Sequence, residues 1–487
     1  MKDFQASRYR DQDFRYFGQD LVLGTLVKDL KDLEVSGTEL PNGEIRRASL
    51  CVIVGDNLGS HCVGGFAENF STSSFFCRFC EIGKKVFATD PLSTGPVRTV
   101  QSYNNNVLAE DLDQKKGVKF DSLFNELSNF HVCNPGLPPC IAHDLFEGIV
   151  SYDLALYIKH LVKVDKHFTY VDLNRRIDQF RYLGNDANDK PLEVNPSSEK
   201  LAGHAVQNWC FLRLLPVLIG DKVKNSNENE VWQLVLQLRN MVEFICAPAI
   251  SSGQIAYLKV MIEDYLYYRK KLFPDHPLRP KHHYVLHYPE LTLKFGPLIR
   301  LWTLRFESKH TYFKQCARKL HNFKNLGSTL AERHQLLQAY LSAGNLFPPP
   351  VVIEKGTDFD LADYNDDIRN ALTNLNCQAN TLISHEAKVK GTTYKKNMFL
   401  VLDQCEEGIV FGKIKAILLK ENSVYFLTEC FSSVTLSDQG LYCLTEKLPK
   451  RLCCVSQEQL LDYYPLPMYK LCGLSVLALH HSFPSLE

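Results

Sequence analysis

The sequence has no excess of charge, no long apolar run and no internal repeat. Its 55 Lys and Arg residues balance 55 Asp and Glu residues, so the formal net charge is zero. Global charge therefore gives no argument for a nucleic-acid binder, and only local clustering of cations could serve that role. No apolar run approaches the roughly 20 residues that a membrane-spanning helix needs. The opening residues MKDFQASRYRDQDFRYFG are polar and charged, so we expect no secretory signal.

The cysteines lack the dense, regular spacing of a secreted disulfide scaffold, although there are 16 of them. We therefore expect reduced thiols, and a Cys-x-x-Cys pair then favours an intracellular metal site. The chain has 487 residues, of which 45% are hydrophobic and 11% aromatic. This composition is that of an ordinary folded protein, and the length predicts two to four domains.

The N-terminal part predicts one helix and one strand. Residues 19–34, QDLVLGTLVKDLKDLE, repeat apolar positions at steps of three and four, which indicates an amphipathic helix. The apolar run from Leu50 to Val54 ends at Gly55 and Asp56. We interpret it as a buried strand that delivers the Asp56 carboxylate at its C-terminal end.

The rest of the chain changes from helical to strand-like patterns. From Pro138 to about residue 275, and again from Trp302, the apolar spacing is helical. The prolines of FPPPVV at 347–352 end the second run. After residue 380, apolar segments separated by Gly, Asp and Ser predict a small antiparallel sheet or barrel.

Two separated motifs carry metal-ligand chemistry. SFFCRFCEIG contains Cys77 and Cys80, and KHHYVLHYPE contains His282, His283 and His287. Four residues separate His282 from His287, within the spacing of common Cys2His2 zinc sites. Spacing slightly favours His282 over His283 and does not decide between them. The alternative is that the histidines begin a helix and the cysteines are half-buried thiols.

A basic segment follows the histidines. Between Lys294 and Lys324 there are eight Lys or Arg residues and one acidic residue, Glu307. A carboxylate among cations suits phosphodiester cleavage, because carboxylates hold Mg²⁺ while Lys and Arg neutralise DNA phosphates. The alternative is a solvated basic helix in which Glu307 shares a face with Lys314, two turns further on.

The order of these motifs resembles a known family. The string HHYVLHYPELTLKFGPLIRLWTLRFESKHTYFKQCARKLHNFKN resembles the catalytic block of animal CACTA (En/Spm)-like DDE transposases, and more distantly the V(D)J recombinase core. In that family a His pair precedes GP…W…FE, whose glutamate closes the catalytic triad. GDNLGSH and LPPCIAHDLFEG are also similar to family blocks. The likeness runs from about residue 15 to 345.

The resemblance implies an α/β fold with an incomplete RNase H-like core. The first strands of that core are not found, so the sequence looks N-terminally truncated, and a large all-helical insertion interrupts the core. The expected divisions are a partial core at 1–84, a loop and helical insertion at 85–280, the His pair and catalytic helix at 281–346, a linker at 347–380 and a small β-rich domain at 381–487.

The resemblance also implies site residues. Asp56 and Glu307 would be catalytic ligands of Mg²⁺, and a structural Zn²⁺ would be held by Cys77, Cys80, His282 and His287. The expected DNA contacts are Arg305, Lys309, Lys314, Arg318 and Lys319. The resemblance implies that the partner is DNA, bound through its phosphate backbone, and that the protein acts in the nucleus. A homodimer is a further possibility that the sequence does not decide.

The first aspartate of the triad has no good counterpart, since Asp11 and Asp13 lie in a polar arm before the first helix. We therefore expect a transposase-derived protein without cleavage activity. One alternative is a non-catalytic DNA- or chromatin-binding descendant, and another is a zinc-stabilised scaffold whose basic helix meets a protein. His143 and Glu147, one helical turn apart, suggest either an auxiliary ligand or DNA contact or, more simply, a capped helix start.

Overall fold

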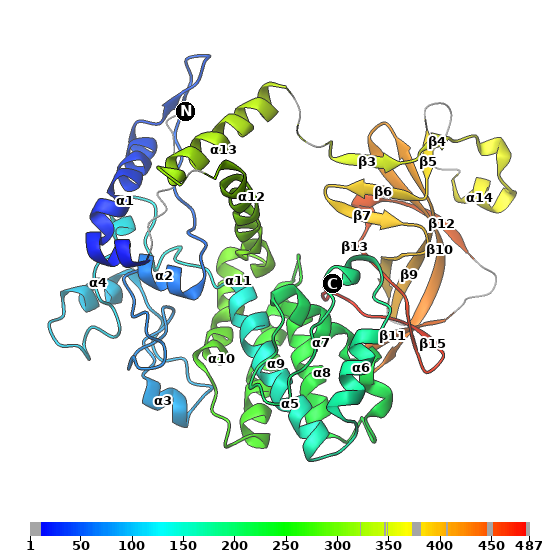
Figure 1. Ribbon diagram of the computed structural model, residues 1–487, viewed down its shortest axis with the longest axis horizontal. Coiled ribbons are helices and arrows are strands. Elements are labelled where there is room, and N and C mark those ends of the chain that lie inside the picture. The colour runs from blue at the N-terminus through cyan, green and yellow to red at the C-terminus, as the bar shows by residue number, and fades with distance from the viewer. Residues whose placement is uncertain are drawn as a thin grey trace. The chain divides into compact units, whose positions relative to one another are not determined.

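The computed structural model describes residues 11–321, 323–344, 347, 349–372, 381–405, 408–445 and 451–483. The fold is mixed, with helices and antiparallel sheets (Figure 1). Two compact units each combine two separate stretches of chain: Met1–Ile149 with Ile255–Phe347, and Val150–Gln254 with Pro348–Glu487. We call them unit 1 and unit 2. Across the described ranges, none of the helices is both long and apolar enough to cross a membrane.

Unit 1 begins with the predicted amphipathic helix. Helix α1 spans Asp11–Val35 but is interrupted at Gly18, whose backbone is not helical, and the part after Gly18 contains the expected residues 19–34. Its residue Val27 is buried in a core with Phe66, Tyr103 and Phe130. Short helices follow, and they are α2 (Asn57–Val63), α3 (Lys84–Thr89), α4 (Val100–Leu108), η1 (Leu123–Glu126) and the π-helix η2 (Ala142–Val150).

The predicted strand at Leu50–Val54 is wrong. These residues belong to no helix or strand, and Cys51 is exposed. A strand needs a hydrogen-bonded neighbour. In the described part of unit 1 the strands are only β1 (Thr38–Glu39) and β2 (Ile45–Arg46), which pair with each other. The apolar run is therefore left without a sheet to join.

Unit 1 ends in a series of helices. They are α9 (Ser252–Leu272), α10 (Pro280–Tyr284), η5 (Val285–His287), α11 (Tyr288–Phe295), η6 (Leu298–Leu301), α12 (Leu304–Leu320) and α13 (Leu326–Ala343). The helical run predicted from Trp302 is confirmed, but as two helices. His321 and Asn325 take left-handed backbone conformations between α12 and α13 and allow the chain to turn.

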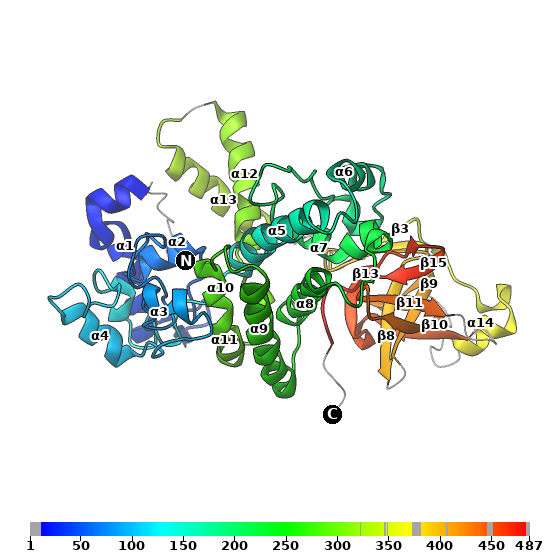
Figure 2. The same ribbon diagram turned by 90° about the horizontal axis from the view of Figure 1, so that it is seen from below.

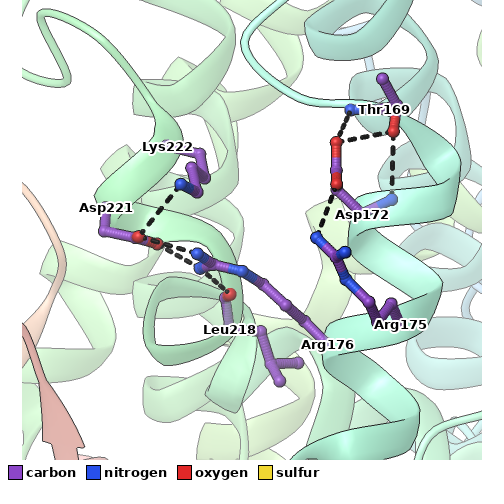
Figure 3. Close-up of polar contacts among 7 residues, drawn as sticks. All are labelled: Thr169, Asp172, Arg175, Arg176, Leu218, Asp221 and Lys222. Carbon is purple, nitrogen blue, oxygen red and sulfur yellow. Dashed lines mark hydrogen bonds and ion pairs between the residues drawn. The ribbon is translucent and has the colours of Figure 1, made fainter.

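The first part of unit 2 is helical, as the sequence predicts. Its main helices are α5 (Ser151–Lys163), α6 (Tyr170–Gln179), α7 (Ala205–Ile219), followed by the short η4 (Gly220–Lys222), and α8 (Glu230–Ile245). Figure 3 shows how α6 is held. Thr169 and Asp172 form a reciprocal capping box at its start, and Arg176 binds Asp221 and donates to the Leu218 carbonyl (2.8 Å).

The second part of unit 2 is a large antiparallel sheet, which confirms the predicted β-rich C-terminal region. Strands β9 (Gly408–Lys420) and β10 (Ser423–Leu436) pair along most of their length (Figure 1, Figure 2). The path β13-β8-β9-β10-β11-β15-β14 uses β8 (Phe399–Cys405), β11 (Leu441–Thr445), β13 (Asp462–Leu466), β14 (Tyr469–Leu471) and β15 (Leu474–Leu477). Strand β12 (Leu452–Ser456) also pairs with β10. A smaller sheet joins β3 (Val351–Glu354), β6 (Glu386–Val389) and β7 (Thr392–Lys395).

Buried polar contacts join the helices of unit 2 to its sheet. Trp232 donates its indole N–H to the Asp438 carbonyl (2.8 Å). The Tyr469 hydroxyl donates to Asp186 (2.7 Å), whose other oxygen binds Arg213. Arg213 and Asp186 side chains are each 4% exposed, so this ion pair is desolvated and each charge depends on its partner.

Candidate metal centre

The cysteine half of the centre is a tight loop. Cys77 and Cys80 are both buried, and Cys80 forms an isolated antiparallel bridge with Val97. The backbone N–H of Phe79 points at the Cys77 sulfur (3.3 Å), and Arg98 donates to the Cys77 carbonyl (3.1 Å). N–H groups directed at a sulfur stabilise its thiolate form, which is the form that binds a metal.

The histidine half is a short helical segment. Pro280 begins α10, where its missing N–H costs nothing. His283 lies in α10 and His287 ends η5, four residues later. Residues four apart on a helix share a face. Both imidazoles therefore turn toward the cysteine loop, and both are buried.

The four side chains meet in one cluster. The ligand atoms of Cys77, Cys80, His283 and His287 all lie within 4.8 Å of one another. The His287 Nε2 is 3.6 Å from the Cys77 sulfur, and the His283 Nε2 is 3.2 Å from the Cys80 sulfur. The two Nε2 atoms are 3.1 Å apart. A tetrahedral zinc would set about 3.5 Å between sulfur and nitrogen and about 3.3 Å between nitrogens. The buried Cys2His2 cluster can therefore hold a metal ion such as zinc.

The structure corrects one expected ligand, because His283 takes the place given to His282. His282 is five residues from His287, a separation that places the two on different sides of a helix. Its Nδ1 instead accepts a hydrogen bond from the Arg279 N–H (3.0 Å) as part of the cap of α10. Zinc sites allow several spacings between their histidines. Because this segment is helical, His283 shares a face with His287 and His282 does not.

The electrostatics of the cluster favour one thiolate even without an ion. Burial opposes ionisation of Cys77, but the hydrogen bond from Cys80 and the two imidazoles lower its pKa well below the usual range. The hydrogen bond to Cys77, together with burial, raises the pKa of Cys80. A divalent cation would remove the second proton as well, because thiol ligands bind metals in the deprotonated form.

Aromatic side chains enclose the centre. Phe76 and Phe87 lie edge-on to the His283 ring at 5.4 and 5.5 Å between centroids, and Phe79 lies 5.4 Å from the His287 ring. The Tyr284 hydroxyl donates to the Phe76 carbonyl (3.0 Å), which ties the histidine segment to the cysteine loop. An apolar shell of this kind excludes water and strengthens the attraction between the ligands and a cation.

A buried polar chain leads from the centre to η2. Arg78, between the two cysteines, donates to the Asn57 amide oxygen (2.7 Å), and Asn57 donates to Asp144. Asp144 also accepts a hydrogen bond from the Tyr288 hydroxyl (3.1 Å). Burial raises the pKa of the Asp144 carboxyl, although Arg78 opposes this effect. Three segments that are distant in sequence are thereby held together.

Glu307 lies in a second polar cluster that the sequence did not predict as a unit. The Thr303 hydroxyl donates to the Glu307 carboxylate (2.8 Å), and the His143 Nε2 is 3.9 Å from both Glu307 and Glu147. The Cys140 sulfur lies 3.1 Å from the His143 Nδ1. The hydrogen bond with Cys140 raises the pKa of His143 to about 9, so its imidazolium sits beside two carboxylates.

Asp56 is an N-cap residue. It precedes α2, and its Oδ1 accepts a hydrogen bond from the Gly59 N–H (2.6 Å). In the described part of the chain, no polar contact joins Asp56 directly to Glu307. An indirect connection runs through neighbouring residues. Asn57 binds Asp144, and the preceding residue, His143, faces Glu307.

The predicted DNA-contacting cations lie on α12. Lys309, Lys314, Arg318 and Lys319 are exposed, whereas the Arg305 side chain lies outside the described residues. Glu307, Lys314 and Arg318 recur at spacings of seven and four, so they follow one face of the helix. All three side chains on that face are exposed.

None of the protein-family models matches the chain, and none of the curated proteins matches it.

Proposed function

We propose that the Cys2His2 cluster holds one structural Zn²⁺. The supporting observation is that four buried donors of the correct chemistry, from segments about 200 residues apart, meet at distances that suit a tetrahedral ion. Without a metal, burial would remove water from these thiols and imidazoles without giving them equally strong polar partners. The ion's role is to join the cysteine loop to the helices that precede α12, because no substrate position is left open.

We further propose that the protein is a transposase-derived DNA-binding protein, as the motif order suggests. This proposal is supported by the meeting of the Cys pair and the His pair in one cluster. In the family that the sequence resembles, these pairs bind zinc and the helix with the catalytic glutamate follows the His pair. α12 then presents Lys314 and Arg318 beside Glu307 on an exposed helix. Phosphates would bind these cations with release of counterions, without dependence on base sequence.

The contacts of the Asp56 and Glu307 carboxylates support DNA binding without cleavage. A two-metal site needs several carboxylates around ions about 4 Å apart. Glu307 accepts a hydrogen bond from Thr303 and lies beside His143, and Asp56 caps α2. Among the described residues, neither belongs to a group of three His, Cys, Asp or Glu side chains whose ligand atoms lie close enough together to hold one metal ion.

The test uses the full chain loaded with zinc. Fluorescence anisotropy with a double-stranded DNA probe should show binding that weakens steeply with salt, and a supercoiled-plasmid assay with Mg²⁺ or Mn²⁺ should show no nicking. Failure to bind DNA at low salt would overturn the DNA-binding proposal and leave a zinc-stabilised scaffold. Nicking that Glu307→Gln abolishes would establish catalysis instead.

A further inference from the structure

Two cysteines on neighbouring strands of unit 2 nearly touch. Thr428 of β10 pairs with Cys453 of β12, and Cys430 lies two residues further along the same face of β10. The Cys430 and Cys453 sulfurs are 3.2 Å apart. A disulfide brings sulfurs to about 2.05 Å, so a displacement of about 1 Å would join them.

The groups around the pair favour the thiolate form of one of the two sulfurs, which is the form that attacks a disulfide. The Thr428 hydroxyl lies 3.1 Å from the Cys453 sulfur. The hydrogen bond from Cys430, helped by Thr428 and Arg451, lowers the pKa of Cys453 to about 6, whereas the same hydrogen bond and burial raise the pKa of Cys430. Both side chains are half-buried rather than enclosed, so a small reagent can approach them.

We propose that Cys430 and Cys453 form a redox modification site that low-molecular-weight disulfides convert to a protein disulfide. Cys453 is the attacking thiol and Cys430 the resolving thiol. The site is independent of the zinc cluster, which belongs to unit 1, and of the proposed DNA contacts. Thiol pairs that oxidise in a reducing compartment are usually transient and regulatory rather than structural.

The reaction balances with glutathione disulfide as the oxidant. The Cys453 thiolate attacks one glutathione sulfur, forms a mixed disulfide and releases the first glutathione thiolate. The Cys430 thiol loses its proton to solvent, its sulfur attacks the Cys453 sulfur, and the second glutathione leaves. Two protein thiols are oxidised to one disulfide, while glutathione disulfide is reduced to two thiols. The new bond fastens β12 to β10.

The experiment maps the products on the full chain. Reduced, zinc-loaded protein is incubated with glutathione disulfide, the remaining thiols are alkylated, and peptides are analysed by mass spectrometry without reduction. The expected product is a Cys430–Cys453 linked peptide that dithiothreitol removes. Cys430→Ser should instead retain glutathione on Cys453, and Cys453→Ser should leave Cys430 alkylated.

Cys405→Ser is the matched control, because Cys405 is an exposed thiol of the same sheet. This variant should form the Cys430–Cys453 link as completely as the unmodified protein. Recovery of both Cys430 and Cys453 as alkylated thiols, while exposed cysteines carry glutathione, would overturn the proposal. Equal retention of glutathione on Cys430 in the Cys453→Ser variant would refute the assignment of Cys453 as the attacking thiol.

Discussion

Tyr288 donates a hydrogen bond from its hydroxyl to the buried Asp144 carboxylate at 3.1 Å. Tyr288 follows the metal-centre residue His287, and Asp144 follows His143, which faces Glu307. One contact thus connects the metal centre to the surroundings of the candidate catalytic glutamate.

Removal of this contact should destabilise unit 1. Tyr288→Phe leaves Asp144 with one fewer donor at a fully buried position, so we expect a loss of about 1–3 kcal/mol in unfolding free energy. Chemical denaturation of the zinc-loaded chain measures it. Tyr340→Phe, at a side chain that is 65% exposed, is the matched control and should change stability by less than about 0.5 kcal/mol. Equal stability of the two variants would show that the contact carries no energy.

The two neighbouring histidines should behave differently toward zinc. His283→Ala removes a ligand, so we expect the purified protein to lose most of its zinc and to unfold at a lower temperature. His282→Ala removes a buried side chain that caps α10 and is not a ligand, so this variant should keep one zinc per chain. Metal analysis by mass spectrometry distinguishes them. Loss of zinc from His282→Ala with retention in His283→Ala would reverse the ligand assignment.

The sequence could predict the ligand types but not the complete ligand set. Cys77, Cys80 and His287 follow from the motif spacing. The choice between His282 and His283 depends on the segment being helical, which the prolines and histidines alone do not show. The Leu50–Val54 strand was predicted from its apolar run, yet a strand also needs a partner, and that is a property of the whole fold. The neighbours of Glu307 depend on tertiary contacts, so Cys140 and His143 could not be placed beside it.

His61 should make stability depend on pH. It is buried, its Nδ1 donates to the Ala67 carbonyl (2.8 Å), and burial lowers its pKa to about 3. In the unfolded chain the pKa is about 6.5. The unfolded state therefore gains a proton first as pH falls, and the folded state loses stability below pH 6.5, by about 2 kcal/mol at pH 5.

The comparison of variants isolates this effect. His61→Asn removes the titrating ring, so the stability advantage of the unmodified protein over this variant should shrink between pH 7 and pH 5 in denaturant titrations. His310→Asn replaces an exposed histidine of α12 and should show no such change. A difference between the His61 variant and the unmodified protein that stays constant with pH would mean that His61 is protonated in the folded protein.

The cations of α12 should set the salt dependence of DNA binding. Each phosphate contact contributes a slope of about 0.9 in the plot of log affinity against log salt, so Lys314→Gln combined with Arg318→Gln should reduce the slope by about 1.8. Lys159→Gln, at an exposed position of α5, is the matched control and should leave the slope unchanged. Equal slopes for the double variant and the control would place the DNA contacts elsewhere.

X-ray absorption at the zinc edge identifies the atoms that bind the ion. We expect one zinc per chain with two sulfur neighbours at about 2.3 Å and two nitrogen neighbours at about 2.0–2.1 Å. A folded protein without zinc, or a zinc shell of four sulfurs or of oxygen and nitrogen alone, would contradict a single ion shared by Cys77, Cys80, His283 and His287.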